Sequence, residues 1–370
     1  MIRPYPKAIV PLTSLRFFAA FWVVIYHYVD WLPNTRGPDL PFIGSGLLGV
    51  DFFFILSGFI LTHAHMRQIE ERSLAVKPFL IRRLAKIYPM HLATLLFYVA
   101  LVTALTLAHM KLPNPERYSG VQFVLNVLLI HAWQITDAGA WNFPSWSISA
   151  EWFAYLLFPF MAPFLVRRMA GVRAEWLVAG ALALLVIVWL IAPFVLGASY
   201  FALHSNFGYI RIMPEFLLGI ALYRLGRERS MAWLEGRAIV PLLTLAIVVL
   251  ATFRFLFPTL LLLALLILAA AEVSRQGRTG LLTSRVLSYL GEASYSLYMI
   301  HLPVATLVLQ GVRLKLGHTP LIAVILALPL AVLIAIGSFE LIEKPCQRLL
   351  LRLARQRPPA PVQIDPKPAV

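Results

Sequence analysis

Long apolar runs constrain this chain more than any other feature. Runs of about 17–25 residues, the length that a helix needs to cross a bilayer, recur from near the N-terminus to about residue 343. Of the 370 residues, 60% are hydrophobic and only 13% are charged, which excludes a soluble domain with one solvated surface. The sequence therefore predicts an all-α polytopic membrane protein.

Windowed hydropathy predicts about ten membrane spans. No gap between them is long enough for a soluble domain, so residues 1–343 are expected to form one membrane domain. The first span lacks a small-residue cleavage pattern and is therefore expected to be retained. The predicted spans cover residues 13–32, 45–65, 88–109, 144–166, 175–196, 207–223, 238–254, 255–272, 292–312 and 320–342.

Basic residues set the orientation of these spans. If the N-terminus is cytoplasmic, most of the 32 Lys and Arg residues fall in inner segments. By the positive-inside rule, both termini are then expected in the cytoplasm. This placement also accounts for the formal net charge of +15. Nucleic-acid binding is not expected, because the charge is spread along one membrane face without a soluble, aromatic-interleaved patch.

Two segments are predicted not to span the membrane. Residues 121–133 are apolar but short, so an interfacial or re-entrant helix fits better than an eleventh span. Residues 344–370 form a basic, proline-rich end that can bury little apolar surface. We expect this tail to be a disordered cytoplasmic segment whose basic part can touch anionic lipid.

An arginine and a histidine share one face of the first span. Arg16 and His27 are eleven positions apart, and at about 100° per residue they return to within about 20° of the same helix face. Their axial separation is on the order of 16 Å, so one polar groove can serve both. The alternative is structural: Arg16 anchors the inner end, and His27 bonds a backbone carbonyl.

Other predicted spans carry ionisable residues at compatible depths. Asp51, Glu151 and His301 lie within the second, fourth and ninth spans. Isolated polar groups in hydrocarbon cost several kcal/mol each, so these residues and His27 together predict a solvated reaction cavity. Histidine suits either general acid–base catalysis or a proton relay.

Two further patterns are interpreted structurally. Arg211 and Glu215, four residues apart, are expected to form an ion pair on one helix face. A metal site is not expected: His27 and His301 lie on different spans, and the lone Cys346 offers no cysteine ligand set or internal disulfide.

A basic cluster precedes the third predicted span. Arg83 and Lys86 share a helix face beside Arg82 and predict a phosphate clamp at the inner mouth. The alternative is positive-inside anchoring. The sequence holds no GxxxxGK[ST] or GxSxG motif, so any nucleotide would be held by basic side chains.

Six stretches carry a family pattern and read, in chain order, SLRFFAAFWVVIYHY, GVDFFFILSGFILT, FLIRRLAKIYP, WSISAEWFAYLLFP, SYSLYMIHLP and SFELIEKP. Together they resemble the membrane acyltransferase-3 family, which contains O-antigen and exopolysaccharide O-acetylases. The family is similar in having about ten spans with both ends inside. The resemblance implies a bacterial plasma (inner) membrane enzyme of the short form, without a C-terminal hydrolase-like domain.

The resemblance also implies a reaction. An acyl group, commonly acetyl, would pass from cytoplasmic acetyl-CoA to a hydroxyl of a surface or exported carbohydrate. His27 would be the catalytic acid/base, with Asp51, Glu151 and His301 near it. Arg16 would partner His27 at the donor-side mouth.

The donor phosphates would be held by Arg16, Arg82, Arg83 and Lys86. Lys86 stands where the family's basic R-x-x-R element has a second arginine, and it lacks the bidentate guanidinium fork. Trp152, where the family often has an acidic residue or glutamine, is a further departure.

A transporter or flippase is the alternative function, because buried histidines and carboxylates also relay protons. The sequence leaves open the acceptor, the acyl group, an acyl-enzyme intermediate and the oligomeric state.

Overall fold

The structure is a computed structural model that describes residues 3–112, 114–136, 140–204, 206–229, 231–234, 236, 238–278 and 280–355. Helices dominate these residues, and no strand occurs among them. Eight helices are long and apolar enough to cross a membrane, which confirms the all-α polytopic membrane fold. They are α1 (Val10–Val29), α2 (Leu48–Glu70), α3 (Val76–Leu107), α5 (Trp146–Pro163), α6 (Ala174–Val195), α9 (Leu256–Arg275), α11 (Ser294–Leu316) and α12 (Leu321–Ser338).

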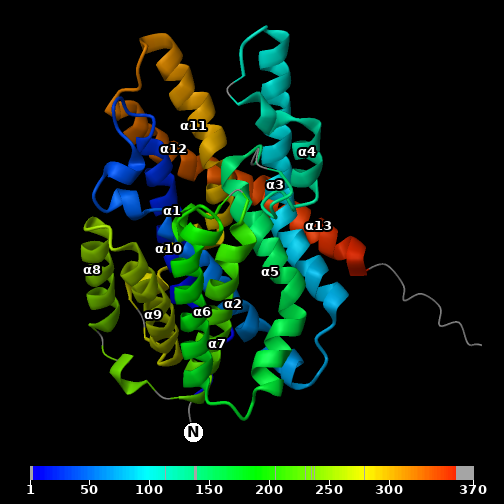
Figure 1. Cartoon of the computed structure of the whole chain (residues 1–370), viewed down its shortest axis with the longest axis vertical. Coiled ribbons are helices and arrows are strands. Elements are labelled where there is room, and N and C mark those ends of the chain that lie inside the picture. Colours follow the sequence, from blue (N-terminus) through cyan, green and yellow to red (C-terminus); the bar gives the residue numbers. More distant parts are fainter. Residues whose placement is uncertain are drawn as a thin grey trace, which may run out of the picture.

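The other two predicted spans are also helices. α7 (Gly208–Glu228) is buried in the bundle and carries several charges, whereas α8 (Ile239–Thr252) has only 14 residues. In Figure 1, α5, α6 and α7 run alongside one another, and α8 pairs with α9 at one side. Which side of the membrane holds the termini stays a prediction.

The close contact between α2 and α7 depends on two glycines. A Cβ atom at Gly219 would lie 2.0 Å from the Ile55 carbonyl oxygen, and one at Gly58 would lie 2.1 Å from that of Phe216. Since both obstacles are backbone, neither can rotate away. The small residues therefore set the distance between the two helices.

Gly219→Ala is expected to lower thermal stability in detergent by about 1–3 kcal/mol, because α7 must move away from α2. Gly180→Ala on α6 is the matched control, since nothing lies within 4 Å of a Cβ there. The control is expected to be neutral or slightly stabilising, because alanine favours a helix over glycine. Equal melting temperatures for the two variants would contradict this account of the contact.

Shorter helices lie outside the spans. α4 (Gly120–Val127) has eight residues and rises about 12 Å, too little to cross a bilayer, as predicted for the segment 121–133. α10 (Arg285–Glu292) packs against α1.

The C-terminal prediction needs a correction. Residues 344–355, expected to be disordered, form helix α13 (Lys344–Arg355), which packs against α3. The sequence KPCQRLLLRLAR is rich in good helix formers, and its leucines 349, 350 and 353 stay exposed beside arginines. Residues 356–370 lie outside the described residues.

One boundary bears on the site. α3 begins at Val76, about three turns before the predicted span. The basic residues of that region are therefore part of the helix, which fixes the directions of their side chains.

Candidate active site

Five helices enclose a cavity of about 190 Å³ whose walls carry most of the predicted donor-side residues. The helices are α1, α2, α3, α5 and α11. The polar wall residues are Thr13, Arg16, Ser57, Arg83, Lys86, Ser147, Glu151, Tyr155, Tyr295 and Tyr298. We call this space the donor cavity, after the sequence-based prediction that Arg16, Arg83 and Lys86 hold the acyl donor.

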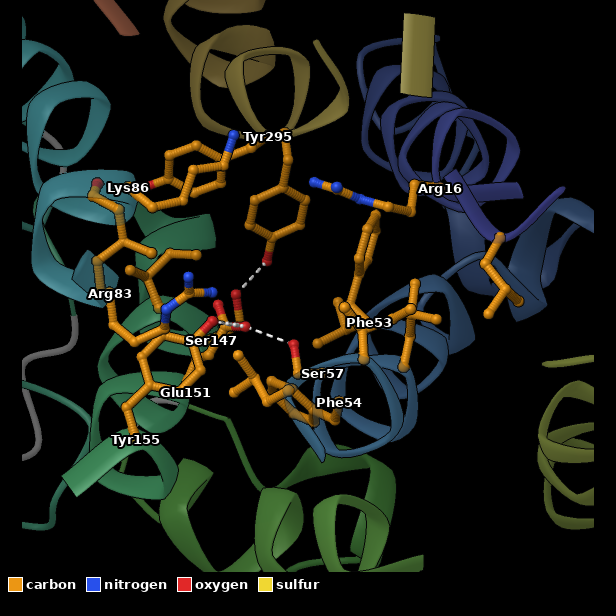
Figure 2. Close-up of a pocket in the computed structure, with 18 of the residues that line it drawn as sticks. Arg16, Phe53, Phe54, Ser57, Arg83, Lys86, Ser147, Glu151, Tyr155 and Tyr295 are labelled. Atoms are coloured by element: carbon orange, nitrogen blue, oxygen red, sulfur yellow. Dashed lines mark hydrogen bonds between the residues drawn. The ribbon is translucent and has the colours of Figure 1, made fainter. Parts of the chain in front are cut away.

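Positively charged side chains line the donor cavity on two sides. Figure 2 shows Arg16 reaching in from α1, with Arg83 and Lys86 on the facing wall. Among the described residues, the guanidinium groups of Arg16 and Arg83 have no ion-pair partner within 4.0 Å. Arg83 Nε makes no hydrogen bond with them either. Arg82, predicted with them, does not line the cavity.

Lys86 is already paired. Its ammonium group donates to Glu343, whose other oxygen accepts a 2.6 Å hydrogen bond from Ser296 Oγ. The Glu343 side chain is fully buried. The pair neutralises Lys86, so Arg83 is the cation of this wall that has no ion-pair partner within 4.0 Å among the described residues.

Glu151 contributes a fixed carboxylate to the cavity wall. Its Oε1 atom accepts hydrogen bonds from Ser57 Oγ at 2.6 Å and from the Tyr155 hydroxyl at 2.5 Å. Tyr155 lies one helical turn after Glu151 on α5. These bonds hold Glu151 against α2, and the structure does not bring it to His27.

His27 and His301 form a direct pair between α1 and α11. The distance from His301 Nε2 to His27 Nδ1 is 3.1 Å. His301 Nδ1 lies 2.6 Å from the Tyr298 carbonyl oxygen, and His27 Nδ1 lies 3.1 Å from that of Val23. His301 is fully buried, whereas His27 is only partly buried.

The carbonyl contacts decide which ring nitrogens carry protons. A carbonyl oxygen only accepts, so His301 carries its proton on Nδ1 and its Nε2 is an acceptor. His27 Nδ1 must then be the donor toward both Val23 and His301. In the neutral pair, this arrangement leaves the lone pair of His27 Nε2 available to take a proton.

The donor cavity ends before it reaches His27. Tyr298 lies on the cavity wall, and its hydroxyl is 2.7 Å from Ser147 Oγ and 2.9 Å from the Pro144 carbonyl oxygen. The Tyr298 ring centroid is 5.9 Å from that of His301. Arg16 lines the donor cavity and His27 does not, so this cavity alone does not form the single groove expected for both residues.

Asp51 forms a buried ion pair with an arginine of α7. Its two oxygens accept bonds of 2.9 and 2.7 Å from Arg211, which is 2% exposed. The ion pair expected between Arg211 and Glu215 is thus made with Asp51, because the guanidinium points from α7 toward α2. Glu215 instead accepts a 2.6 Å bond from the Tyr200 hydroxyl.

No group of three or more His, Cys, Asp or Glu residues that could hold a metal occurs in the described part of the chain.

Comparison with known proteins identifies the family of this chain. The model of the acyltransferase domain family, acyltransferase-3, matches residues 11–340. This chain belongs to the acyltransferase-3 family. The acyltransferase is 33% identical to acyltransferase MdmB of Streptomyces mycarofaciens, over 97% of this chain and 95% of that protein.

Two further relatives are more distant. O-acetyltransferase OatA of Staphylococcus aureus is 24% identical over 93% of the acyltransferase, which spans 58% of the OatA length. Peptidoglycan O-acetyltransferase OatA of Listeria monocytogenes is also 24% identical, over 93% of this chain and 57% of the length of that OatA protein. No solved structure significantly matches the acyltransferase. The family assignment favours an enzyme over the transporter alternative.

The sequence analysis did not predict several of the residues that line the donor cavity. Ser57, Tyr155, Ser147 and Tyr298 are neutral hydroxyls, and such groups carry no signal in a hydropathy or charge pattern. The four-residue spacing of Glu151 and Tyr155 is the one local cue. Their roles depend on contacts between helices.

Proposed function

We propose that this acyltransferase moves an acyl group, preferentially acetyl, from cytoplasmic acetyl-CoA to a hydroxyl of a surface or exported carbohydrate. We place it in the bacterial plasma membrane with both termini in the cytoplasm. The printed names of two relatives, O-acetyltransferase and peptidoglycan O-acetyltransferase, support O-acetylation. The main support for the proposal is the His27–His301 pair, whose contacts leave His27 Nε2 available as a proton acceptor.

The donor cavity supports binding of a thioester with phosphate groups. Arg16 and Arg83 have no ion-pair partner within 4.0 Å among the described residues, and guanidinium groups bind phosphate oxygens with charge-assisted hydrogen bonds. At about 190 Å³ the cavity is smaller than a typical ligand pocket. It suits the pantetheine arm, with the nucleotide held at the mouth and Lys86 beside it.

The proposed chemistry is direct transfer. His27 Nε2 accepts the proton of the acceptor hydroxyl as its oxygen attacks the thioester carbonyl. The carbon–sulfur bond breaks, and the proton passes from His27 to the coenzyme A sulfur. His301 keeps His27 in the required tautomer. Tyr298 lines the donor cavity and its ring lies beside that of His301, so in this proposal its side chain moves aside as the thioester approaches His27.

The donor-binding proposal predicts a result for one arginine. Arg83→Met is expected to raise the KM for acetyl-CoA by about 10–100-fold, the equivalent of one lost hydrogen bond to a charged group. Arg82→Met is the matched control, because Arg82 lies next in the chain but off the cavity. Steady-state kinetics on purified protein measure both. Equal KM values for the two variants would place the donor elsewhere.

Activity is tested on the whole protein in lipid nanodiscs. Release of free coenzyme A from acetyl-CoA, with and without envelope glycan, is expected to depend on the glycan. Mass spectrometry of surface glycans from cells with and without the gene should show loss of O-acetyl groups. Unchanged glycan together with no thioester turnover would count against this function.

A further inference from the structure

A second cavity, separate from the donor cavity, opens on the side of the helix bundle. Its volume is about 1340 Å³, and no residue lines both cavities. Residues of α1 and α8 form its two sides, and residues of α9 line it between them. We call it the α1–α8 groove. α1 separates the two cavities, with Arg16 on one face and Leu15 and Phe18 on the other.

The lining of the α1–α8 groove is almost entirely apolar. Apolar side chains of α1, α8 and α9 that line it include Phe18, Trp22, Leu245, Val248 and Leu266. Leu245 is 60% exposed. Since α1 and α9 meet the criteria for membrane spans, the groove opens toward lipid rather than water. An apolar groove that faces lipid is filled by apolar groups such as acyl chains, because water would find few hydrogen-bond partners there.

The length of the α1–α8 groove fits a lipid chain. It extends along α1 from Pro11 to Ile25, a rise of about 21 Å. One leaflet of the hydrocarbon core is about 15 Å thick, half of the whole. The groove is therefore long enough for an extended acyl chain.

One end of the α1–α8 groove is polar. Arg278 lines it beside Gly277 and Gly280, just after α9 ends at Arg275. The charge pattern assigns this end to the cytoplasm, and the cytoplasmic leaflet carries the anionic lipids that attract basic side chains. An arginine at one end of an apolar groove complements a lipid with a negatively charged head group.

We propose that the α1–α8 groove binds one anionic phospholipid of the cytoplasmic leaflet, with an acyl chain along α1 and the phosphate at Arg278. The bound chain packs on the face of α1 opposite Arg16. This site is independent of the proposed reaction, because it shares no residue with the donor cavity.

Native mass spectrometry of the whole protein in mild detergent tests the site. The wild type is expected to retain one phospholipid. Thr244→Trp places a large ring on the groove wall, where it obstructs a bound chain, and is expected to lower occupancy at least tenfold. Leu242→Trp is the matched control, since Leu242 is 58% exposed on the same helix but off the groove. Thr244→Phe is a second obstructing variant, to be used if the tryptophan variant aggregates.

The head-group contact is tested by titration with phosphatidylglycerol and phosphatidylcholine. Arg278→Gln is expected to reduce the preference for phosphatidylglycerol about fivefold, the effect of one basic residue at a charged surface. Three outcomes would overturn the proposal: no retained lipid in the wild type, equal retention by the Thr244→Trp and Leu242→Trp variants, or a retained mass that identifies an isoprenoid lipid.

Discussion

Replacing His27 with alanine is expected to lower kcat by about 10²–10⁴-fold, the usual contribution of a general base. The His27 Nε2 lone pair is the proton acceptor in the proposed reaction, and alanine offers none. The KM for acetyl-CoA is expected to stay within about twofold, because the donor phosphates bind on the order of 16 Å away along α1. Thioester turnover by purified protein in nanodiscs measures both quantities.

His301 provides the control for this prediction. His301→Gln keeps an acceptor that can face His27 Nδ1 and is expected to retain more activity than His301→Leu, which removes it. A merely structural role for His301 would instead make activity follow thermal stability in both variants. Wild-type kcat in the His27→Ala protein would remove the proposed general base altogether.

Breaking the Asp51–Arg211 pair is expected to cost stability rather than a chemical step. Asp51→Asn leaves the Arg211 guanidinium without its bidentate carboxylate in a fully buried site. Removing one partner of a buried pair typically costs about 3–5 kcal/mol. Thermal unfolding in detergent should therefore shift to markedly lower temperature. The Arg211–Asp51 contact joins α7 to α2, and α5 contributes Trp146 beside Arg211, so loss of the pair loosens the cavity walls.

The matched control is the exposed pair Arg67–Glu71. Its side chains are 87% and 51% exposed, and such pairs contribute about 0–1 kcal/mol. Glu71→Gln should therefore melt like the wild type. If Asp51→Asn also melts like the wild type but loses turnover, Asp51 acts in the reaction, as the sequence analysis expected.

Much of the scaffold follows from local sequence. A membrane helix satisfies its own backbone hydrogen bonds, so each apolar run predicts a helix without reference to its neighbours. All ten predicted spans coincide with helices, including the charged α7 and the short α8. The helical period likewise places Arg16 and His27 on related faces of α1. The prediction of a disordered tail was wrong for residues 344–355, because it treated residues 344–370 as one basic, proline-rich segment. Residues 344–355 are mostly helix-forming and form α13.

The sequence by itself determined the membrane class, the helix positions, the family motifs and the candidate ionisable residues. Tertiary structure alone decided their partners: His301 for His27, Arg211 for Asp51 and Glu343 for Lys86. It also decided that Arg16 lines the donor cavity whereas His27 does not. The physical reason is that hydropathy and helical period are properties of neighbouring residues. Ion pairs and cavities depend instead on how helices distant in the chain pack against one another.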